Sequence, residues 1–529
     1  MSPKSVYILS IPLIIAAFTH LWNPIGQFSP WFGYDEGIYM GRTMNVLSGL
    51  GPHLYFDHPY FGQLFLGGLL WIIGYPNLIH PTVSDIHSFE MLWLVPRIVM
   101  GVLAVVDTFL VYKVAEKRYS RTVALIASIL FAITPLTYFA RWILLDSIQL
   151  PFLLSSILFA LYLGGPSAKY HRHYDLQMSV LSGLFLGLAI FTKIPAFILI
   201  PLVAYLILTN SKKNMKILSL WFMPVIIVPS LWPIYAVYTD QFDEWINTIS
   251  WQAGRSGPDL QDALVYLFTK LDPFLLVFGV IGLAIAALNR DYFLLLWIAP
   301  FLCFLYFLGI VQIFHLLPIT PAFCIAVSVL VVRITDGISF RHKILTRNKK
   351  AMISISLTVV AIIIIFGSIN TGILISSNGT SQYFRAAVLV GEYIKDNHYD
   401  KNLMLLSNPF YYWMFQYVFY PHIQYRNYDS PPEDQPKTDR VVLMADQNFL
   451  SGVNYGREPY EYYFYRYVQN KTGTEIGNES MTNEDWRSYL HVYSYDADSY
   501  KSHLLGSFQI DSGLEYDQVL LIPKNMIFR

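Results

Sequence analysis

Apolar residues gather in long runs over the first 370 residues of the chain. An α-helix of about 20 apolar residues can cross the hydrocarbon core of a bilayer, which is about 30 Å thick. The runs predict about eleven such helices and therefore a polytopic α-helical membrane protein. They cover residues 5–23, 91–112, 123–139, 147–164, 177–192, 195–209, 217–238, 273–289, 292–310, 316–333 and 351–369.

The runs 177–192 and 195–209 are nearly continuous and could form one long span. The stretch Lys193-Ile194-Pro195 predicts a turn, because proline disfavours helix at the preceding residue and lysine favours the membrane interface. At the chain start, only Lys4 precedes the first apolar run and no small-residue cleavage pattern ends it. We therefore expect this run to be a span rather than a cleaved signal peptide.

A polar interruption, residues 24–90, follows the first apolar run and contains the pairs Asp35-Glu36 and Asp57-His58. Residues 37–47 between them have the apolar spacing of a short helix, expected to lie on the membrane surface. Carboxylates beside a bilayer are costly to desolvate, which makes Asp35-Glu36 a site hypothesis. Alternatively, Asp35 caps this helix and Glu36 stabilises its positive N-terminal end.

Beyond residue 370 the composition changes to a polar, tyrosine-rich segment of about 150 residues, the size of one soluble domain. The pattern predicts helices over 383–397 and 410–419 and strands over 403–406 and 441–445. We therefore expect a transmembrane domain over 1–370, with a first external loop over 24–90, and an α/β or α+β domain over 371–529.

Composition and charge agree with this assignment. The chain is 54% hydrophobic and 14% charged, whereas ordinary soluble domains are about one quarter charged. The formal net charge is zero, which gives no reason to expect a nucleic-acid partner. Cys303 and Cys324 both lie in apolar runs, so we expect packing residues rather than a disulfide framework.

The positive residues gather in alternate loops, and the positive-inside rule places those loops in the cytoplasm. They are Lys113, Lys117, Arg118, Arg121, Lys169, Arg172, Lys212, Lys213, Lys216, Arg333, Arg341, Lys343, Arg347, Lys349 and Lys350. With the N-terminus inside, the first loop, the acidic loop 239–272 and the C-terminal domain face outward. The outer face then also receives Arg141, Asp146 and Lys193.

A membrane enzyme that transfers a sugar from a lipid phosphate needs a base for the acceptor hydroxyl, cations for the leaving phosphate and a groove for the lipid. Asp35 can accept the hydroxyl proton while the oxygen attacks the anomeric carbon from the face opposite the phosphate. Arg141 and Lys193 can stabilise the phosphate charge. The spans can provide the apolar groove.

These residues resemble the motifs of the GT-C class of integral-membrane glycosyltransferases, particularly the dolichyl-phosphate-mannose protein mannosyltransferases and the lipid A aminoarabinose transferase. The matching segments, in chain order, are Asp35-Glu36, His58-Pro59, Arg141 with Leu145-Asp146-Ser147, residues 187–195 (GLAIFTKIP) and residues 315–321 (HLLPITP). The resemblance covers roughly residues 30–325. It implies that Asp35 is the catalytic base and that external basic residues hold the lipid phosphate.

On this basis we place Asp35, Glu36 and Asp146 in the catalytic set. Arg141 and Lys193 are assigned to the donor phosphate, and Asp57, His58 and His315 to substrate positioning. No cofactor is expected. Some relatives bind zinc through a first-loop glutamate and a later histidine, for which this chain offers Glu36 and His315, but without clustered ligand spacing.

The sequence departs from the family pattern in two places. The histidine-proline-proline element is His58-Pro59-Tyr60 here, which leaves the role of that loop in placing donor or acceptor open. The tryptophan-tryptophan-aspartate motif of oligosaccharyltransferases is absent from the sequence after residue 370, which disfavours transfer of a whole oligosaccharide.

Each site residue also has a structural interpretation. Asp146-Ser147 can cap the fourth span, Arg141 can reach lipid headgroups, Lys193 can mark a turn, and His315 can be a hydrogen-bonded interfacial residue. Two other functions stay open. One is a lipid or solute transporter or flippase, which would place ionisable residues near the bilayer midplane. The other is a non-catalytic anchor for the outer domain.

The sequence as a whole predicts a multi-pass cell-membrane glycosyltransferase with an extracytoplasmic active site. Its donor would be a polyprenyl-phosphate-linked hexose or pentose, transferred with inversion. Its acceptor would be a hydroxyl of a protein, glycan or lipid. Beyond these substrates we expect only membrane lipids as partners.

Overall fold

The structure is a computed structural model of the 529-residue chain. It describes residues 3–26, 35–49, 56–79, 86–164, 171–335, 349–397, 403–406, 424–425, 440–445, 489–496 and 502–509. The chain divides into two compact units. The first comprises residues 1–22, 54–65 and 98–375, and the second comprises residues 23–53, 66–97 and 376–529.

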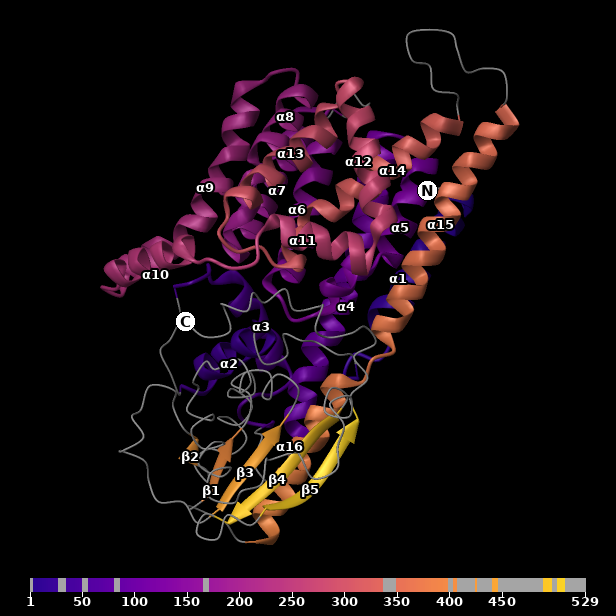
Figure 1. Ribbon diagram of the computed structural model, residues 1–529. Coiled ribbons are helices and arrows are strands. Elements are labelled where there is room, and N and C mark those ends of the chain that lie inside the picture. Colours follow the sequence, from indigo (N-terminus) through magenta and orange to yellow (C-terminus); the bar gives the residue numbers. More distant parts are fainter. Residues whose placement is uncertain are drawn as a thin grey trace. The chain divides into compact units, whose positions relative to one another are not determined.

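The first unit is entirely helical over its described residues (Figure 1). Helices α3 (Phe61–Ile72) and α4 (Ile86–Arg118) contribute residues to both units. The other elements of the first unit are α1 (Pro3–Leu21), α5 (Arg121–Ile133), η1 (Pro135–Arg141), α6 (Leu145–Tyr162), α7 (His171–Thr192), η2 (Ile194–Leu199), α8 (Ile200–Asn210), α9 (Met215–Tyr238), α10 (Phe242–Gly254), α11 (Leu260–Tyr266), the π-helical turn η3 (Leu267–Leu271), α12 (Pro273–Leu288), α13 (Tyr292–Phe307), η4 (Ile313–Ile319), α14 (Thr320–Thr335) and α15 (Lys349–Ile375).

Each of the eleven apolar runs is helical, as the sequence predicts. Among the described residues, six helices are long and apolar enough to cross a membrane, or seven if the bent pair α5 and η1 is one span. The protein is therefore a multi-pass membrane protein, and the number eleven stays a prediction. The apolar helix α3 lies inside the predicted external loop and was missed.

Prolines determine where two of the spans break. Helix α5 ends at Ile133, Pro135 begins η1 after the single residue Thr134, and the axis turns by 70° between the two helices. The turn predicted at Lys193-Ile194-Pro195 is confirmed, because α7 ends at Thr192 and Lys193 is extended with φ −153° and ψ 125°. Both breaks leave a charged side chain beside an interrupted helix, Arg141 in the first case and Lys193 in the second.

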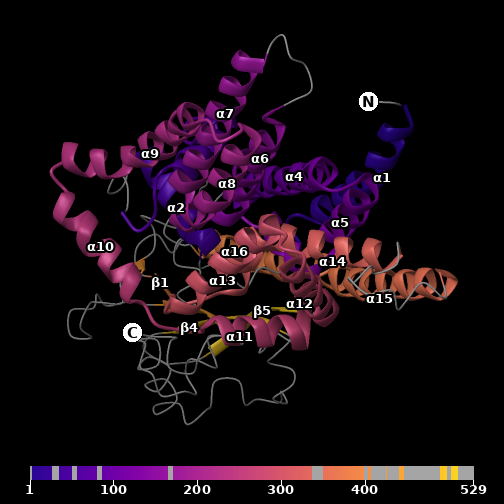
Figure 2. The same cartoon turned by 90° about the horizontal axis from the view of Figure 1, so that it is seen from above.

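Helix α7 packs closely against α9 within the first unit (Figure 2). Gly183 and Gly187 make this approach possible, since a Cβ atom at Gly187 would lie 2.5 Å from the Pro224 carbonyl oxygen. Their four-residue spacing is the small-residue pattern found where membrane helices come close. The approach brings the last turns of α7, where Lys193 follows, against the proline-containing helix α9.

The second unit contains α2 (Asp35–Ser48), α16 (Gly379–Asp396) and a five-stranded sheet of order β2-β1-β3-β4-β5. The strands are β1 (Leu403–Leu406), β2 (Gln424–Tyr425), β3 (Arg440–Ala445), β4 (Tyr489–Asp496) and β5 (Ser502–Gln509). Strand β1 pairs in parallel with β2 and β3, whereas β3–β4 and β4–β5 are antiparallel.

Alternation of side chains explains how α16 covers this sheet. Val442 and Met444 on β3 and Val492 on β4 are buried. Gly506 on β5 allows close approach, because a Cβ atom there would lie 2.7 Å from Leu389 Cδ2 on α16. The predicted helix over 383–397 and strands over 403–406 and 441–445 are thus present, while residues 410–419 lie outside the described part.

The two units differ from the predicted domains mainly in the first external loop. The division at Ile375–Ser376 is close to the predicted one at residue 370. Of the predicted first external loop, residues 24–53 and 66–90 group with the C-terminal segment and residues 54–65 group with the first unit. Residues 91–97, predicted as the start of the second span, also group with the C-terminal segment.

Candidate active site

A buried ion pair lies where α6 begins and α7 ends. Lys193 Nζ is 2.6 Å from Asp146 Oδ2, and the two side chains are 8% and 4% exposed. Asp146 does not cap α6, because the N-cap residue is Leu144 and no side chain bonds there. The capping interpretation of Asp146 is therefore wrong. Its carboxylate lies in the first turn, where the helix dipole favours negative charge.

Gln149 fixes this pair from one turn further along α6. Its Nε2 donates to the Ala189 carbonyl oxygen at 3.0 Å and also to the carbonyl oxygen of Lys193. The amide thus joins α6 to the last turn of α7 and to Lys193 at the break. The sequence analysis did not single out Gln149, since nothing local shows that a buried amide faces another helix.

Element η4 brings Phe314 and His315 to the same place. Lys193 Nζ lies 5.3 Å from the centre of the Phe314 ring, within reach of a cation–π interaction. His315 Nδ1 accepts a hydrogen bond from the Gln312 N–H at 3.2 Å, so the neutral ring carries its proton on Nε2. Lys193, Arg255 and His58 lie near enough to His315 to act on it electrostatically.

Arg255 is a cation that the sequence analysis did not select. It follows α10 and is half-buried, and its guanidinium donates to Gln252 Oε1 at 3.0 Å. The segment around it pairs with the chain entering η4, through Gly257 N–H to the Gly309 carbonyl at 2.8 Å. The sequence does not show that the loop containing Arg255 bonds to the chain before η4, so it gave no reason to select Arg255.

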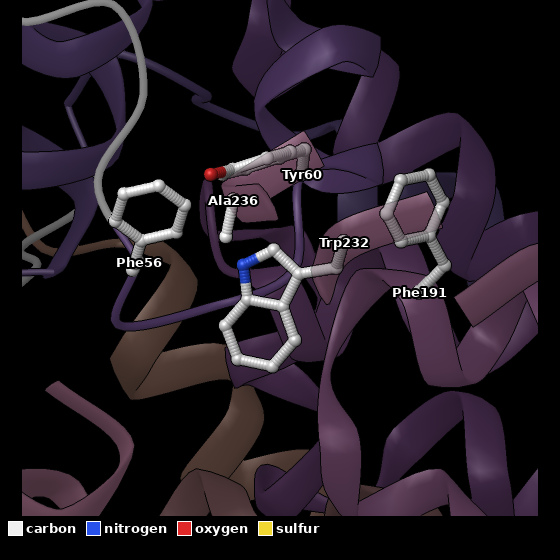
Figure 3. Close-up of a cluster of buried hydrophobic side chains, with 5 residues drawn as sticks. All are labelled: Phe56, Tyr60, Phe191, Trp232 and Ala236. Atoms are coloured by element: carbon white, nitrogen blue, oxygen red, sulfur yellow. The ribbon is translucent and has the colours of Figure 1, made fainter. Parts of the chain in front are cut away.

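Asp57 and His58 lie in the chain between two members of a buried hydrophobic cluster, which consists of Phe56, Tyr60, Phe191, Trp232 and Ala236. In Figure 3 the Trp232 ring lies between Phe56 and Phe191. Burial raises the pKa of the Tyr60 hydroxyl above its ordinary value. Ile194 packs against this cluster, so the residue after Lys193 and the residues flanking Asp57-His58 share one packing region.

Arg141 is held elsewhere in the first unit. Its guanidinium donates to the Thr19 carbonyl oxygen at 2.9 Å and to that of Trp22, at the C-terminal end of α1. The side chain is buried, and 5.7 Å separates its guanidinium carbon from the centre of the Tyr138 ring. A cation suits a helix C-terminus, where carbonyl groups lack partners. The geometry thus gives Arg141 a structural role, and its contact with a lipid phosphate stays a prediction.

Asp35 and Glu36 belong to the second unit, at the start of the predicted short helix, which is present as α2. Asp35 is half-buried. Glu36 is fully buried and accepts two hydrogen bonds from Arg97, at 3.3 Å from Nε and 2.8 Å from Nη2. The ion pair with Arg97 explains the burial of the Glu36 carboxylate without a catalytic role. The catalytic assignments of Asp35 and Glu36 stay predictions.

A third carboxyl group, Asp272, ends the acidic loop 239–272. It accepts hydrogen bonds from the Leu275 N–H at 2.9 Å and from Thr134 Oγ1 at 3.0 Å, and so caps α12. Burial raises the pKa of this carboxyl to about 6. Among the described residues, no three His, Cys, Asp or Glu side chains are grouped to hold a metal ion.

Comparisons with known proteins support the resemblance. Residues 87–232 match the family described as dolichyl-phosphate-mannose-protein mannosyltransferase. This segment contains Arg97, Arg141, Asp146 and Lys193. A search of curated proteins finds no match.

Solved structures with a similar fold include an oligosaccharyltransferase from Archaeoglobus fulgidus and ArnT from Cupriavidus metallidurans. The Archaeoglobus fulgidus oligosaccharyltransferase tethered to an acceptor peptide has a TM-score of 0.55 at 12% identity, covering 95% of this chain and 74% of its own. The same enzyme with an inhibitory peptide and a dolichol-phosphate has a TM-score of 0.53 at 12% identity, with coverages of 95% and 74%. ArnT from Cupriavidus metallidurans in the apo state has a TM-score of 0.51 at 11% identity, covering 85% and 94%. The chain thus has the GT-C fold and resembles the GT-C membrane glycosyltransferases, with its family match centred on the segment that contains the Asp146–Lys193 pair.

Proposed function

We propose that the protein is an inverting glycosyltransferase that moves a monosaccharide from a polyprenyl-phosphate carrier to an acceptor hydroxyl at the outer membrane face. The acceptor oxygen bonds to the anomeric carbon on the face opposite the phosphate. The bond between that carbon and the phosphate oxygen breaks, and the polyprenyl phosphate leaves with the electron pair. Asp35 takes the acceptor proton.

The Asp146–Lys193 pair is the observation that carries this proposal. The pair is buried, Lys193 lies at the break between α7 and η2, and both residues lie inside the segment that matches the mannosyltransferase family. An ammonium group has three N–H donors. Asp146 fixes the position of the Lys193 ammonium by accepting one of them, so the others are available to phosphate oxygens.

Neighbouring residues complete the proposed donor site. Arg255 supplies a second cation whose planar fork suits phosphate oxygens. His58, Asp57 and His315 are proposed to position the substrates. The dolichol-phosphate and the peptides bound by the Archaeoglobus fulgidus enzyme support a lipid-linked donor and a separate acceptor. For this chain the acceptor class is the hydroxyl of a protein, a glycan or a lipid.

One reconstitution experiment separates this function from the two alternatives. Purified protein in lipid vesicles is given a polyprenyl-phosphate sugar labelled in the sugar ring, with and without candidate acceptors. Label transferred only when an acceptor is present supports the proposal. Movement of the intact donor between leaflets without transfer would indicate a flippase, and neither event with any donor or acceptor would indicate a non-catalytic anchor.

The orientation of the site is a separate part of the proposal, motivated by the positive residues in alternate loops. Reporter fusions after Lys350 and after Arg529 should report opposite sides of the membrane, cytoplasmic for the first and external for the second. The same side for both would overturn the extracytoplasmic assignment.

A further inference from the structure

Arg97 joins three segments of the second unit that are far apart in the sequence. Its Nε and Nη2 donate to Glu36 in the first turn of α2, and its Nη1 donates to the Pro24 carbonyl oxygen at 3.0 Å. Its Nη2 also donates to Thr380 Oγ1 on α16 at 3.4 Å. The Arg97 and Glu36 side chains are both 0% exposed.

A second contact ties the same segments together. Asn23 Nδ2 donates to the Ser377 carbonyl oxygen at 2.9 Å, and Asn23 Oδ1 accepts from the Gly26 N–H at 3.0 Å. The chain that leads toward α2 is thus bonded to the residues that begin α16. The first turn of α2, which contains Asp35, is held through Glu36 by Arg97 from α4.

From this geometry we infer that Arg97 is a positioning residue for the transfer reaction, and that Thr380 of the C-terminal segment supports it. A guanidinium fork that binds a carboxylate at two points fixes the rotation of α2 as well as its position. Asp35 precedes Glu36 on the same helical turn, so its carboxylate direction depends on this bond. The inference rests on the proposed function, because Asp35 is the base only in that proposal.

The inference also gives the C-terminal segment a part in the reaction. Thr380, which lies 283 residues beyond Arg97, accepts a hydrogen bond from the guanidinium that holds α2, and the Ser377 carbonyl accepts one from Asn23 in the chain before α2. Residues of the C-terminal segment therefore help to hold the segment that bears the proposed base.

The test uses the full-length protein and the variant Arg97→Lys, which keeps the charge but loses the two-point fork. Because misplacing a reacting group by about 1 Å can cost about a hundredfold in rate, we expect kcat to fall by about tenfold to a hundredfold while the donor Kd changes little. Arg118→Lys is the matched control, because Arg118 lies on the same helix and pairs with Asp291 at 3.3 Å. Its kcat should equal that of the wild type.

A second readout does not depend on activity. Hydrogen exchange of the backbone amides in residues 35–49 should accelerate by about tenfold in Arg97→Lys and not in Arg118→Lys. Thr380→Val should show the same change more weakly, and Thr380→Ser, which keeps the hydroxyl, should restore wild-type exchange and kcat.

The outcomes distinguish this inference from the proposed function. Unchanged exchange in Arg97→Lys, or accelerated exchange with wild-type kcat, would overturn the positioning role while leaving the proposed function intact. A wild-type protein that transfers no sugar would instead overturn the proposed function, and with it the catalytic part of the inference.

Discussion

Two buried ion pairs, Asp146–Lys193 and Glu36–Arg97, occupy the two units of this protein, and they differ in how their charges are used. Arg97 binds Glu36 at two points and also bonds to Pro24 and Thr380, and neither charged side chain is exposed. Within the described part of the chain the Lys193 ammonium makes one hydrogen bond, to Asp146, and the side chain retains slight exposure beside the Phe314 ring. The first arrangement suits a structural connection, and the second suits binding of an anion. The sequence shows that a carboxylate and a cation are present. The role of each pair becomes clear only from the number of hydrogen bonds that the cation makes in the structure.

The largest effect is expected at Asp35, next to the structural pair. Asp35→Asn keeps the size of the side chain but removes the proton acceptor, so turnover should fall by about 10²–10⁴-fold, the usual contribution of general-base catalysis. Donor binding should be unchanged. Turnover and donor affinity are measured on the same preparation.

The matched control for Asp35→Asn is Asp243→Asn, an exposed acid in the first turn of α10, which should keep full turnover. Glu36→Gln is a poor control, because it disturbs the buried pair with Arg97. Full activity in Asp35→Asn would remove Asp35 from the mechanism.

Glu36→Gln should act on stability. Removing one charge of a buried ion pair leaves the other uncompensated, which typically costs about 3–5 kcal/mol. The free energy of unfolding is measured by denaturant titration in detergent, with Glu116→Gln as control, because Glu116 pairs with Lys113 at a more exposed site. Equal stability of Glu36→Gln and wild type would contradict the structural assignment of this pair.

Asp272 is a buried carboxyl group that, unlike Glu36 and Asp146, is bonded to a hydroxyl and a backbone N–H instead of a cation. Its folded pKa of about 6 exceeds the unfolded value of 3.8. The stability it contributes is therefore fully present below about pH 4 and is lost as pH rises through about 6. The total change is about 3 kcal/mol.

Unfolding of wild type and Asp272→Asn across pH 4–7 tests this dependence. The wild type should lose stability over that range relative to the variant, whose amide can still cap α12 but does not titrate. Parallel pH profiles for the two proteins would show that Asp272 has an ordinary pKa.

Lys193→Ala should weaken donor binding by about tenfold to a hundredfold, because a charge-assisted contact is worth roughly 1.5–3 kcal/mol. The same range is predicted for Arg141→Ala. Lys113→Ala is the matched control, since Lys113 Nζ also lies 2.6 Å from a carboxylate oxygen.

The double variant Lys193→Ala with Asp146→Ala separates the two roles of this pair. The double variant should be more stable than Lys193→Ala, because neither charge is left buried without its partner. Its affinity for the donor should stay as low as that of Lys193→Ala. Wild-type donor affinity in both Lys193→Ala and Arg141→Ala would show that neither cation binds the carrier phosphate.

Much of the fold followed from the sequence, because apolar runs of sufficient length have few alternatives to helices. Pro195 also indicated the break at Lys193, and the apolar spacing of 383–397 indicated α16. Helix α3 was missed because its apolar run is only 12 residues long and lies between polar segments.

The partners of the charged residues could not be predicted. Glu36 and Arg97 are 61 residues apart, and Asp146 and Lys193 are 47 apart. Helical periodicity shows which side of a helix is apolar, but it does not show which donor on another helix meets a given carboxylate. For the same reason Arg255 and Gln149 were not selected, although both lie at the candidate site.

The central claim is transfer of the sugar with release of the carrier, and the most direct measurement follows both products. Purified wild-type protein is incubated with a polyprenyl-phosphate sugar of known anomeric configuration and an acceptor. Free polyprenyl phosphate is quantified while NMR determines the configuration of the new glycosidic bond. We predict one carrier phosphate released for each bond formed, with the opposite configuration. Carrier release that is independent of acceptor, or a product with retained configuration, would contradict the account.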